Sequence, residues 1–344
     1  MSKIKVVPRD NRPLVPSFIF GRRVDMIFRI ILLIVGFIVL IKGADLFVDG
    51  ASAVASNFKV SKMLIGLTIV SFGTSAPEFA VSIKSLLVDS GDIVLGNVIG
   101  SNILNILLII GVSALFHSLN VKNATVKKEL PITILITLLF STLLLDNVFE
   151  KNMVNSFTRG DGVVVILFFL IFIYYLITMM RNKTEEDMTS TDMKLSKALV
   201  FTLLGIGAII LGSNFVVDSA SEIARGFGIS EKMVGLTIIA LGTSLPELVT
   251  SVMATRKGEY DIAIGNVVGS NIFNIGIVIG VPVAIFGTIP NVTINAVDII
   301  VMIVAAVLLF LFSFRDRKID KKEGIIFLLI FIIYYAYVIY GGLK

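Results

Sequence analysis

The chain has 344 residues, of which 56% are hydrophobic and 16% are charged, against roughly 25% charged in an ordinary soluble domain. It contains no cysteine, which excludes disulfides, iron–sulfur clusters and thiolate zinc sites. It contains no Gly-Lys dipeptide, so the phosphate-binding loop of ATP-driven pumps is absent and we expect no nucleotide. The net charge of +5 lies mostly in loops without interleaved aromatic residues, which argues against nucleic-acid binding.

Long apolar runs recur along the chain, and each supplies much of the about 20 residues that a helix needs to cross a bilayer. They include residues 30–41, 132–145, 163–177, 299–312 and 325–340. Polar connections divide the apolar sequence near Lys59, Asp89, Lys122, Glu150, Lys183, Arg225, Arg256, Asn291 and Arg317. We therefore predict an all-α integral membrane protein with ten transmembrane helices and no cofactor. The single histidine, His117, is interpreted as a solvated loop residue.

The second half of the chain repeats the first at an offset of 169 residues. Residues 66–82 read GLTIVSFGTSAPEFAVS, and residues 235–251 read GLTIIALGTSLPELVTS. At the same offset, GNVIGSNILN at 96–105 becomes GNVVGSNIFN at 265–274, with eight of ten positions identical. A unit of five spans must lie upside down when it is repeated, as in secondary transporters with a site near the bilayer midplane. We predict two inverted five-helix repeats.

This division predicts a basic tail at 1–25, a first repeat at 26–180, a short linker at 181–197 and a second repeat at 198–344. The odd-numbered connections carry 16 Lys or Arg residues, against 6 in the even-numbered connections and the C-terminal end. The positive-inside rule then places the linker in the cytoplasm and both termini outside the cell. The tail is itself basic and would favour a cytoplasmic start, so one interpretation is that it is an upstream extension before Met26.

Polar side chains form one stripe along the second span of each repeat. Ser71, Thr74, Ser75, Glu78 and Ser82 share one helical face, and the seventh span repeats the pattern with Ala240, Thr243, Ser244, Glu247 and Ser251. A membrane-buried carboxylate costs at least about 2.5 kcal/mol on insertion scales, so two at equivalent positions indicate a function. The alternative, that duplicated helices only stabilise a bundle, would favour apolar residues at these positions.

Each glutamate follows directly after a proline, Pro77 or Pro246, and a glycine lies four residues before each proline. Proline removes a backbone hydrogen bond and crowds the preceding turn, so we expect each helix to break there. Broken helices at membrane depth are tolerated where freed carbonyls line an ion site. Four carboxylate oxygens with the carbonyls of Thr74 and Thr243 give six oxygens, the lower end of the six to eight that calcium takes.

The third span of each repeat adds neutral oxygen atoms that suit sodium. The residues are Asn97, Ser101 and Asn105, matched by Asn266, Ser270 and Asn274. For Asn97, Asn102, Asn266 and Asn271, a bridging role between helices is an equal alternative. Small residues on the third spans permit close helix packing; they are Gly96, Gly100, Gly265 and Gly269. The first span carries a separate strip of glycines, Gly36, Gly43 and Gly50, which would suit either sliding or close packing. With no thiol, and no histidine in a span, the ligands favour hard cations over copper, zinc or iron.

The two GTSxPE segments and the two GNVxGSNxxN segments resemble the paired alpha-repeats of the sodium/calcium exchanger family, within the calcium/cation antiporter superfamily. The likeness covers nearly the whole chain after Met26 and implies an antiporter, not an enzyme, that exchanges Ca2+ for Na+ in the cell membrane. We take the candidate ion ligands to be Ser71, Thr74, Ser75, Glu78, Ser101, Asn105, Ala240, Thr243, Ser244, Glu247, Ser270 and Asn274.

Two departures from the family pattern refine this prediction. Potassium-dependent members, and some prokaryotic sodium/calcium exchangers, carry Asp where this chain has Asn274. The short connection at 181–197 leaves no room for the calcium-sensing domains of animal exchangers. Proton-coupled members have repeats closer to GNATE, so GTSxPE favours sodium coupling. A proton/calcium antiporter on the same fold and a passive cation channel remain the alternatives, and the oligomeric state is open.

Overall fold

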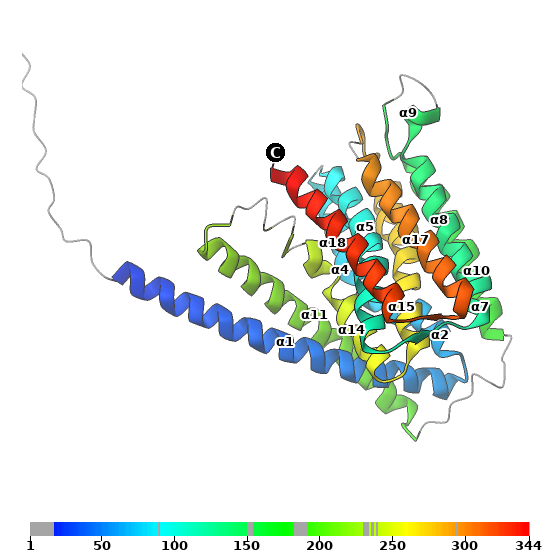
Figure 1. The fold of residues 1–344 in the computed structure, drawn as a ribbon, viewed down its shortest axis with the longest axis horizontal. Helices are drawn as coiled ribbons and strands as arrows, with labels where there is room; N and C mark the ends of the chain where they lie inside the picture. The colour runs from blue at the N-terminus through cyan, green and yellow to red at the C-terminus, as the bar shows by residue number, and fades with distance from the viewer. Residues whose placement is uncertain are drawn as a thin grey trace, which may run out of the picture.

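A computed structural model describes residues 17–88, 90–149, 154–181, 192–229, 234, 237–238, 240–292 and 295–343. Most of the predicted tail, and residues 182–191 of the predicted linker, lie outside these ranges. The described residues are almost wholly helical (Figure 1). They include seven helices long and apolar enough to span a membrane, or eight if one bent pair counts as a span. The chain is therefore a multi-pass membrane protein.

The first half of the chain runs from α1 to α10. Its elements are α1 (Ser17–Phe58), α2 (Lys62–Ile65), the π-helical η1 (Gly66–Val70), α3 (Ser71–Thr74), α4 (Ala76–Leu87), α5 (Gly91–Leu104), the π-helical η2 (Asn105–Ile110), α6 (Gly111–Phe116), β1 (Leu119–Asn120), α7 (Asn123–Lys127), α8 (Glu129–Leu143), α9 (Asp146–Phe149) and α10 (Arg159–Arg181). The helix α1 begins upstream of Met26, where the sequence predicted the first span to start. Ser61 caps α2, because its Oγ accepts a hydrogen bond from Leu64 N at 3.1 Å.

The second half repeats the central elements of the first, from the broken helix to the π-helical segment. It comprises α11 (Leu195–Gly226), α13 (Ala240–Thr243), α14 (Leu245–Arg256), α15 (Tyr260–Phe273), the π-helical η5 (Asn274–Ile279), α16 (Gly280–Phe286), α17 (Ala296–Asp316), β2 (Lys318–Ile319) and α18 (Lys321–Leu343). The bounds of α13, α14, α15 and η5 are those of α3, α4, α5 and η2 advanced by the offset of the sequence repeat. The duplication therefore extends from sequence to local structure.

Of the ten predicted spans, α8 is short at 15 residues, and the segment that leads into α13 falls partly outside the described residues. The bent pair, Lys62–Thr74 with Ala76–Leu87, turns by 45° at its break. The described residues thus contain seven or eight helices that meet the length and composition of a span, and ten spans stay a prediction.

The helices α1 and α11 form an antiparallel pair that slants away from the other helices (Figure 1). A Cβ added at Gly36 would lie 2.9 Å from Phe215 Cβ, and one at Gly50 would lie 2.5 Å from Thr202 N. In the opposite direction, a Cβ at Gly212 would lie 2.5 Å from Leu40 N. The glycine strip of α1 thus faces α11, so it joins these two helices closely and does not offer a sliding surface to the bundle.

The small-residue face predicted on the third span of the second half packs against the second span of the first half. A Cβ at Gly265 would lie 3.0 Å from Gly66 Cα, and one at Gly269 would lie 2.7 Å from Ser71 Oγ, so α15 packs closely on η1 and α3. The close packing that the sequence predicted for these two glycines is therefore present.

Connections between helices gather at two ends of the bundle. At one end β1 pairs with β2, Lys122 Nζ lies 2.9 Å from Asp261 Oδ2, and Asn57 Nδ2 donates to Met193 O at 2.9 Å. These contacts join connection three to connections seven and nine, and connection one to connection five. The ion pair of Lys62 with Glu259, at 2.7 Å, links the two groups. At the other end Phe157 bridges Ile289, which joins connections four and eight. The alternation between ends is what successive membrane crossings produce.

Candidate ion-binding site

The polar stripes predicted from the sequence lie on two broken helices. Ser75 separates α3 from α4 with φ −83° and ψ 6°, and Ser244 separates α13 from α14 with φ −89° and ψ 6°. The predicted breaks are confirmed, and each lies at the proline, which occupies the first turn of the new helix. Glu78 and Glu247 also occupy the first turns of α4 and α14, where the helix dipole favours a negative charge.

Each serine at a break reaches the glutamate of the other repeat. Ser75 Oγ lies 2.9 Å from Glu247 Oε1 and 3.0 Å from Ser270 Oγ. Ser244 Oγ lies 3.4 Å from Glu78 Oε1 and 3.3 Å from Ser101 Oγ. Both glutamates are only 1% exposed. The two repeats therefore meet in one buried cluster that holds both carboxylates.

Four buried oxygen atoms in this cluster accept no hydrogen bond from any described residue. They are Glu78 Oε2, Glu247 Oε2, Asn105 Oδ1 and Asn274 Oδ1, which form two pairs related by the sequence repeat. A buried acceptor without a partner costs about 1–3 kcal/mol, and more when it is charged. Four such costs at equivalent positions are explained if a cation is the missing partner.

The orientation of the two amides is fixed by a second pair of asparagines. Asn105 Nδ2 donates to Asn271 Oδ1 at 2.9 Å, and Asn274 Nδ2 donates to Asn102 Oδ1 at 3.1 Å. Asn102 and Asn271 also donate to each other's main-chain carbonyls, at 3.4 and 3.3 Å. Because each amide nitrogen is used in this way, the oxygen of Asn105 or Asn274 is the atom left available. Both residues begin a π-helical segment, a feature that is frequent at functional sites.

Asn97 and Asn266 join the third helix of each repeat to the broken helix. Asn97 Nδ2 lies 3.1 Å from Glu78 O and 3.3 Å from Ser82 Oγ. Asn266 Nδ2 lies 3.4 Å from Glu247 O and 2.9 Å from Ser251 Oγ. Of the two alternatives left open by the sequence, the bridging role describes these side chains. They position the backbone of the two glutamates.

The remaining predicted residues lie along the same stripes. Thr74 Oγ1 lies 3.0 Å from Asn266 Oδ1 and 3.1 Å from Val70 O. Ser71 Oγ donates to Thr68 O at 3.3 Å, one turn from the break. Thr243 ends α13 and is partly buried. Ala240 begins α13, and its side chain lies outside the described part of the chain.

One polar atom beside the site was not predicted. Thr250 Oγ1, three residues after Glu247, is buried and accepts or donates no hydrogen bond among the described residues. The repeat pattern could not indicate it, because the equivalent residue of the first repeat is Val81. Helical spacing from Glu247 alone could have suggested it.

The donor set is suited to a hard cation. Within the described ranges, no group of three or more His, Cys, Asp or Glu side chains could hold a metal ion. The cluster instead combines two carboxylates with amide and hydroxyl oxygens, which are ligands for calcium or sodium rather than for zinc or copper. The ions would be transported substrates, so a mixture of charged and neutral oxygens fits both binding and release.

Comparison with known proteins decides the family. The sequence model described as sodium/calcium exchanger protein matches residues 28–178 and 197–340, which together make up most of the chain. The chain belongs to the sodium/calcium exchanger family. The resemblance seen in the two alpha-repeats is thereby confirmed.

Relatives of this exchanger-family chain span nearly its whole length. It is 39% identical over 320 residues to the putative antiporter CaxA of Alkalimonas amylolytica, covering 90% of this chain and 98% of the relative. It is 29% identical over 353 residues to the sodium/calcium exchanger MaX1 of Methanosarcina acetivorans, with 90% and 98% covered. Among solved structures, the exchanger NCX_Mj soaked with 10 mM Na+ and zero Ca2+ superposes with a TM-score of 0.79 at 32% identity, covering 90% of this chain and 99% of that one. The exchanger fold therefore extends over the whole bundle and the site within it.

Proposed function

We propose that this calcium/cation antiporter exchanges Ca2+ for Na+ through the buried cluster around Glu78 and Glu247. The observation that carries the proposal is the set of four unpartnered oxygens, two from carboxylates and two from amides, at positions related by the repeat. The carboxylates supply a formal charge of −2, which one calcium ion neutralises. The hydroxyls of Ser75 and Ser244, each hydrogen-bonded to one of the two glutamates, bring the number of candidate oxygens to six.

Sodium is the coupling ion that the neutral oxygens favour over protons. A proton-coupled return step needs only the two carboxylates, which can be protonated. It gives no role to the amide oxygens of Asn105 and Asn274, whose nitrogens are held by neighbouring asparagines so that the oxygens are left available. A sodium ion uses such neutral ligands. The GTSxPE form of the repeats also favours sodium coupling, and so does the likeness to MaX1, a sodium/calcium exchanger.

For the architecture, we propose ten membrane crossings arranged as two inverted repeats, 26–180 and 198–344. The helices α3, α4 and α5 recur as α13, α14 and α15 with bounds shifted by the 169-residue offset of the sequence repeat, which supports a duplicated unit. The odd-numbered connections gather at one end of the bundle, which supports five crossings in each unit. A unit with an odd number of crossings starts and ends on opposite sides of the membrane, so the second unit is inverted relative to the first. The basic residues of those connections support a cytoplasmic location for that end and the linker 181–197, with both termini outside. The tail 1–25 would precede the repeats, with its last residues, from Ser17, continuous with α1.

Coupling follows from the electrostatics of the empty site. A cage with two buried negative charges is costly to expose to an apolar barrier, whereas a cage filled by cations is close to neutral. The antiparallel pair α1 and α11 is joined by its own glycine contacts, so it moves as one body across the broken helices. Only occupied states cross in this scheme, so calcium and sodium must alternate.

The decisive experiment is calcium uptake by proteoliposomes under three conditions: an outward sodium gradient, an outward proton gradient, and neither. We expect uptake with sodium alone. Uptake with the proton gradient and not with sodium would establish the proton/calcium alternative. Rapid uptake without either gradient, driven by calcium itself and insensitive to counter-ions, would establish a channel.

A further inference from the structure

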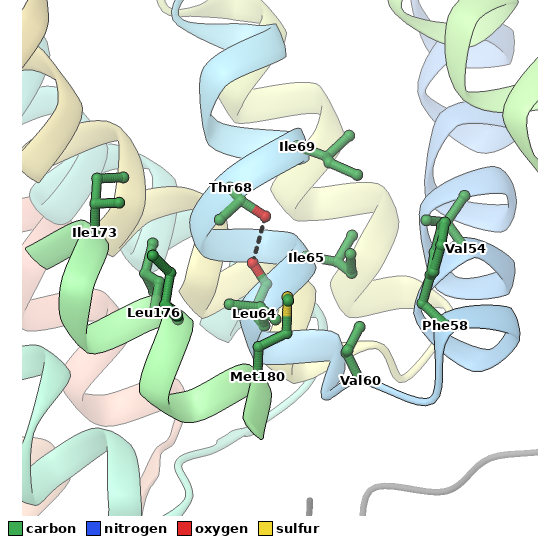
Figure 2. A pocket seen from close by; sticks show the side chains of 11 residues that line it. Val54, Phe58, Val60, Leu64, Ile65, Thr68, Ile69, Ile173, Leu176 and Met180 are labelled. Carbon is green, nitrogen blue, oxygen red and sulfur yellow. Dashed lines mark hydrogen bonds between the residues drawn. The ribbon is translucent and has the colours of Figure 1, made fainter. Parts of the chain in front are cut away.

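An apolar groove outside the ion site opens between α1 and α10, with the start of the second span as its floor (Figure 2). Val54 and Phe58 of α1 form one side, and Ile173, Leu176 and Met180 of α10 form the other. The cavity measures about 520 Å³, within the roughly 300–1,000 Å³ of ordinary ligand sites. It lies on the surface that would face lipid, because Phe58 and Met180 are half-exposed at its edge.

The wall of the groove is suited to a hydrocarbon chain. Thr68 contributes the single hydroxyl among the lining side chains, and it donates to Leu64 O at 2.6 Å within its own helix turn. Figure 2 shows this bond on the floor of the groove, beside Ile65 and Ile69. The wall therefore offers no free polar group to a ligand inside it, and only an apolar group would gain from binding there.

Positive charge stands at one end of the groove. Lys59 lies between the lining residues Phe58 and Val60, and Arg181 follows the lining residue Met180. Both cations are exposed, and neither forms an ion pair with any acidic side chain of the described residues. They lie at the end where the odd-numbered connections gather. An apolar groove with two exposed cations at one end is complementary to an amphiphile with a negatively charged headgroup.

We propose that this groove binds one acyl chain of an anionic phospholipid, with the lipid phosphate held by Lys59 and Arg181. Basic sites between membrane helices recognise anionic headgroups in this way, and the cytoplasmic leaflet supplies them. The bound chain contacts both α1 and α10. If α1 moves during exchange, as the proposed function requires, the lipid stabilises one of its positions and so changes the exchange rate.

The test is a lipid titration of the full-length protein in uncharged detergent, followed by the thermal unfolding temperature. Phosphatidylglycerol should raise that temperature in a saturable manner, and phosphatidylcholine should need a higher concentration. The double variant Lys59→Gln/Arg181→Gln should raise the midpoint concentration for phosphatidylglycerol about 10- to 30-fold. Because both residues are exposed, the unfolding temperature without lipid should match the wild type.

Matched variants separate the groove from general surface charge. Lys127→Gln/Lys321→Gln removes two other exposed cations at the same end and should leave the midpoint unchanged. Ile177→Trp places a large side chain into the groove wall and should abolish the saturable shift. The proposal is overturned if the control pair weakens binding as much as the Lys59/Arg181 pair, if phosphatidylcholine or inorganic phosphate gives the same midpoint as phosphatidylglycerol, or if Ile177→Trp binds like the wild type. Since the readout is binding, it stays valid whether or not the protein uses sodium.

Discussion

Lys257 forms ion pairs between α1 and the end of the helix that carries Glu247. Lys257, directly after α14, places its Nζ 2.7 Å from Asp45 Oδ1 and 2.6 Å from Asp49 Oδ1, and donates to Asp45 O at 2.8 Å. The two aspartates are one helical turn apart on α1. Substitution Lys257→Gln removes both ion pairs and leaves the packing of α1 on α11 untouched. It therefore tests whether α1 moves relative to the ion site.

The expected size of the effect follows from the exposure of the three side chains. Lys257 is 23% exposed, and Asp45 and Asp49 are 43% and 49% exposed, so water screens both pairs. Such pairs contribute about 0.2–1 kcal/mol each, and two together about 0.5–2 kcal/mol. Since 1.4 kcal/mol is a factor of ten, the equilibrium between the two positions of α1 should shift about 2- to 30-fold.

The assay is calcium-dependent exchange in proteoliposomes, with the KM for calcium measured separately on each side. If α1 moves, Lys257→Gln should change the ratio of the two KM values by the factor above. A control is Lys62→Gln, which breaks a 2.7 Å pair with Glu259 between α2 and the loop after α14. That variant should lower the unfolding temperature without changing the ratio. If Lys257→Gln behaves in the same way as the control, α1 stays fixed to α14 and the proposed movement is wrong.

Four other outcomes are expected. Glu78→Gln or Glu247→Gln, at normal membrane insertion, should reduce calcium exchange to background, because one of two charges opposing the ion is lost; near wild-type exchange would refute the site. Exchange should proceed in potassium-free medium, since Asn274 supplies an amide and no carboxylate; a strict potassium requirement would contradict this. With three sodium ions per calcium, as the family resemblance implies, one net charge moves per cycle, worth about 2.3 kcal/mol per 100 mV. Calcium uptake against outward sodium should then accelerate when a potassium–valinomycin clamp makes the interior positive, and indifference to the clamp would exclude that stoichiometry. A tag after Lys344 should be accessible only from outside the cell, and cytoplasmic access would reverse the orientation.

The sequence was sufficient to predict the broken helices and the meeting of the two carboxylates. Proline beside glutamate is a local signal, because the loss of a backbone hydrogen bond acts within one turn. The breaks at Ser75 and Ser244 follow from it directly. The repeat then supplied the long-range information, since a duplicated site-bearing helix predicts that the two copies face each other, as they do in transporters with inverted repeats.

The roles of individual asparagines could not be predicted in the same way. Asn102 and Asn105 are three residues apart in one helix; Asn105 was predicted to bind an ion, whereas for Asn102 a bridging role was an equal alternative. Their difference arises from the register between α5 and α15, which puts Asn102 opposite Asn274 and Asn105 opposite Asn271. Such register depends on the packing of the whole bundle. The same holds for Lys257, whose partners lie more than 200 residues earlier in the chain.

The hydrogen bonds across the repeats explain why the two halves must stay together for the site to exist. Ser75 orients the carboxylate of Glu247, and Ser244 orients that of Glu78, so neither half completes the proposed ligand set by itself. The asparagine pairs on α5 and α15 join the halves again, next to the available amide oxygens. These bonds make the centre of the bundle a rigid frame, because breaking any one leaves a buried polar group without a partner. In the proposed exchange, access to the ions alternates through elements outside that frame. The glycine-joined pair α1 and α11 is the element suited to move, because its polar ties to the frame among the described residues are few: the ion pairs of Lys257 and the hydrogen bonds of Ser52 and Ser213.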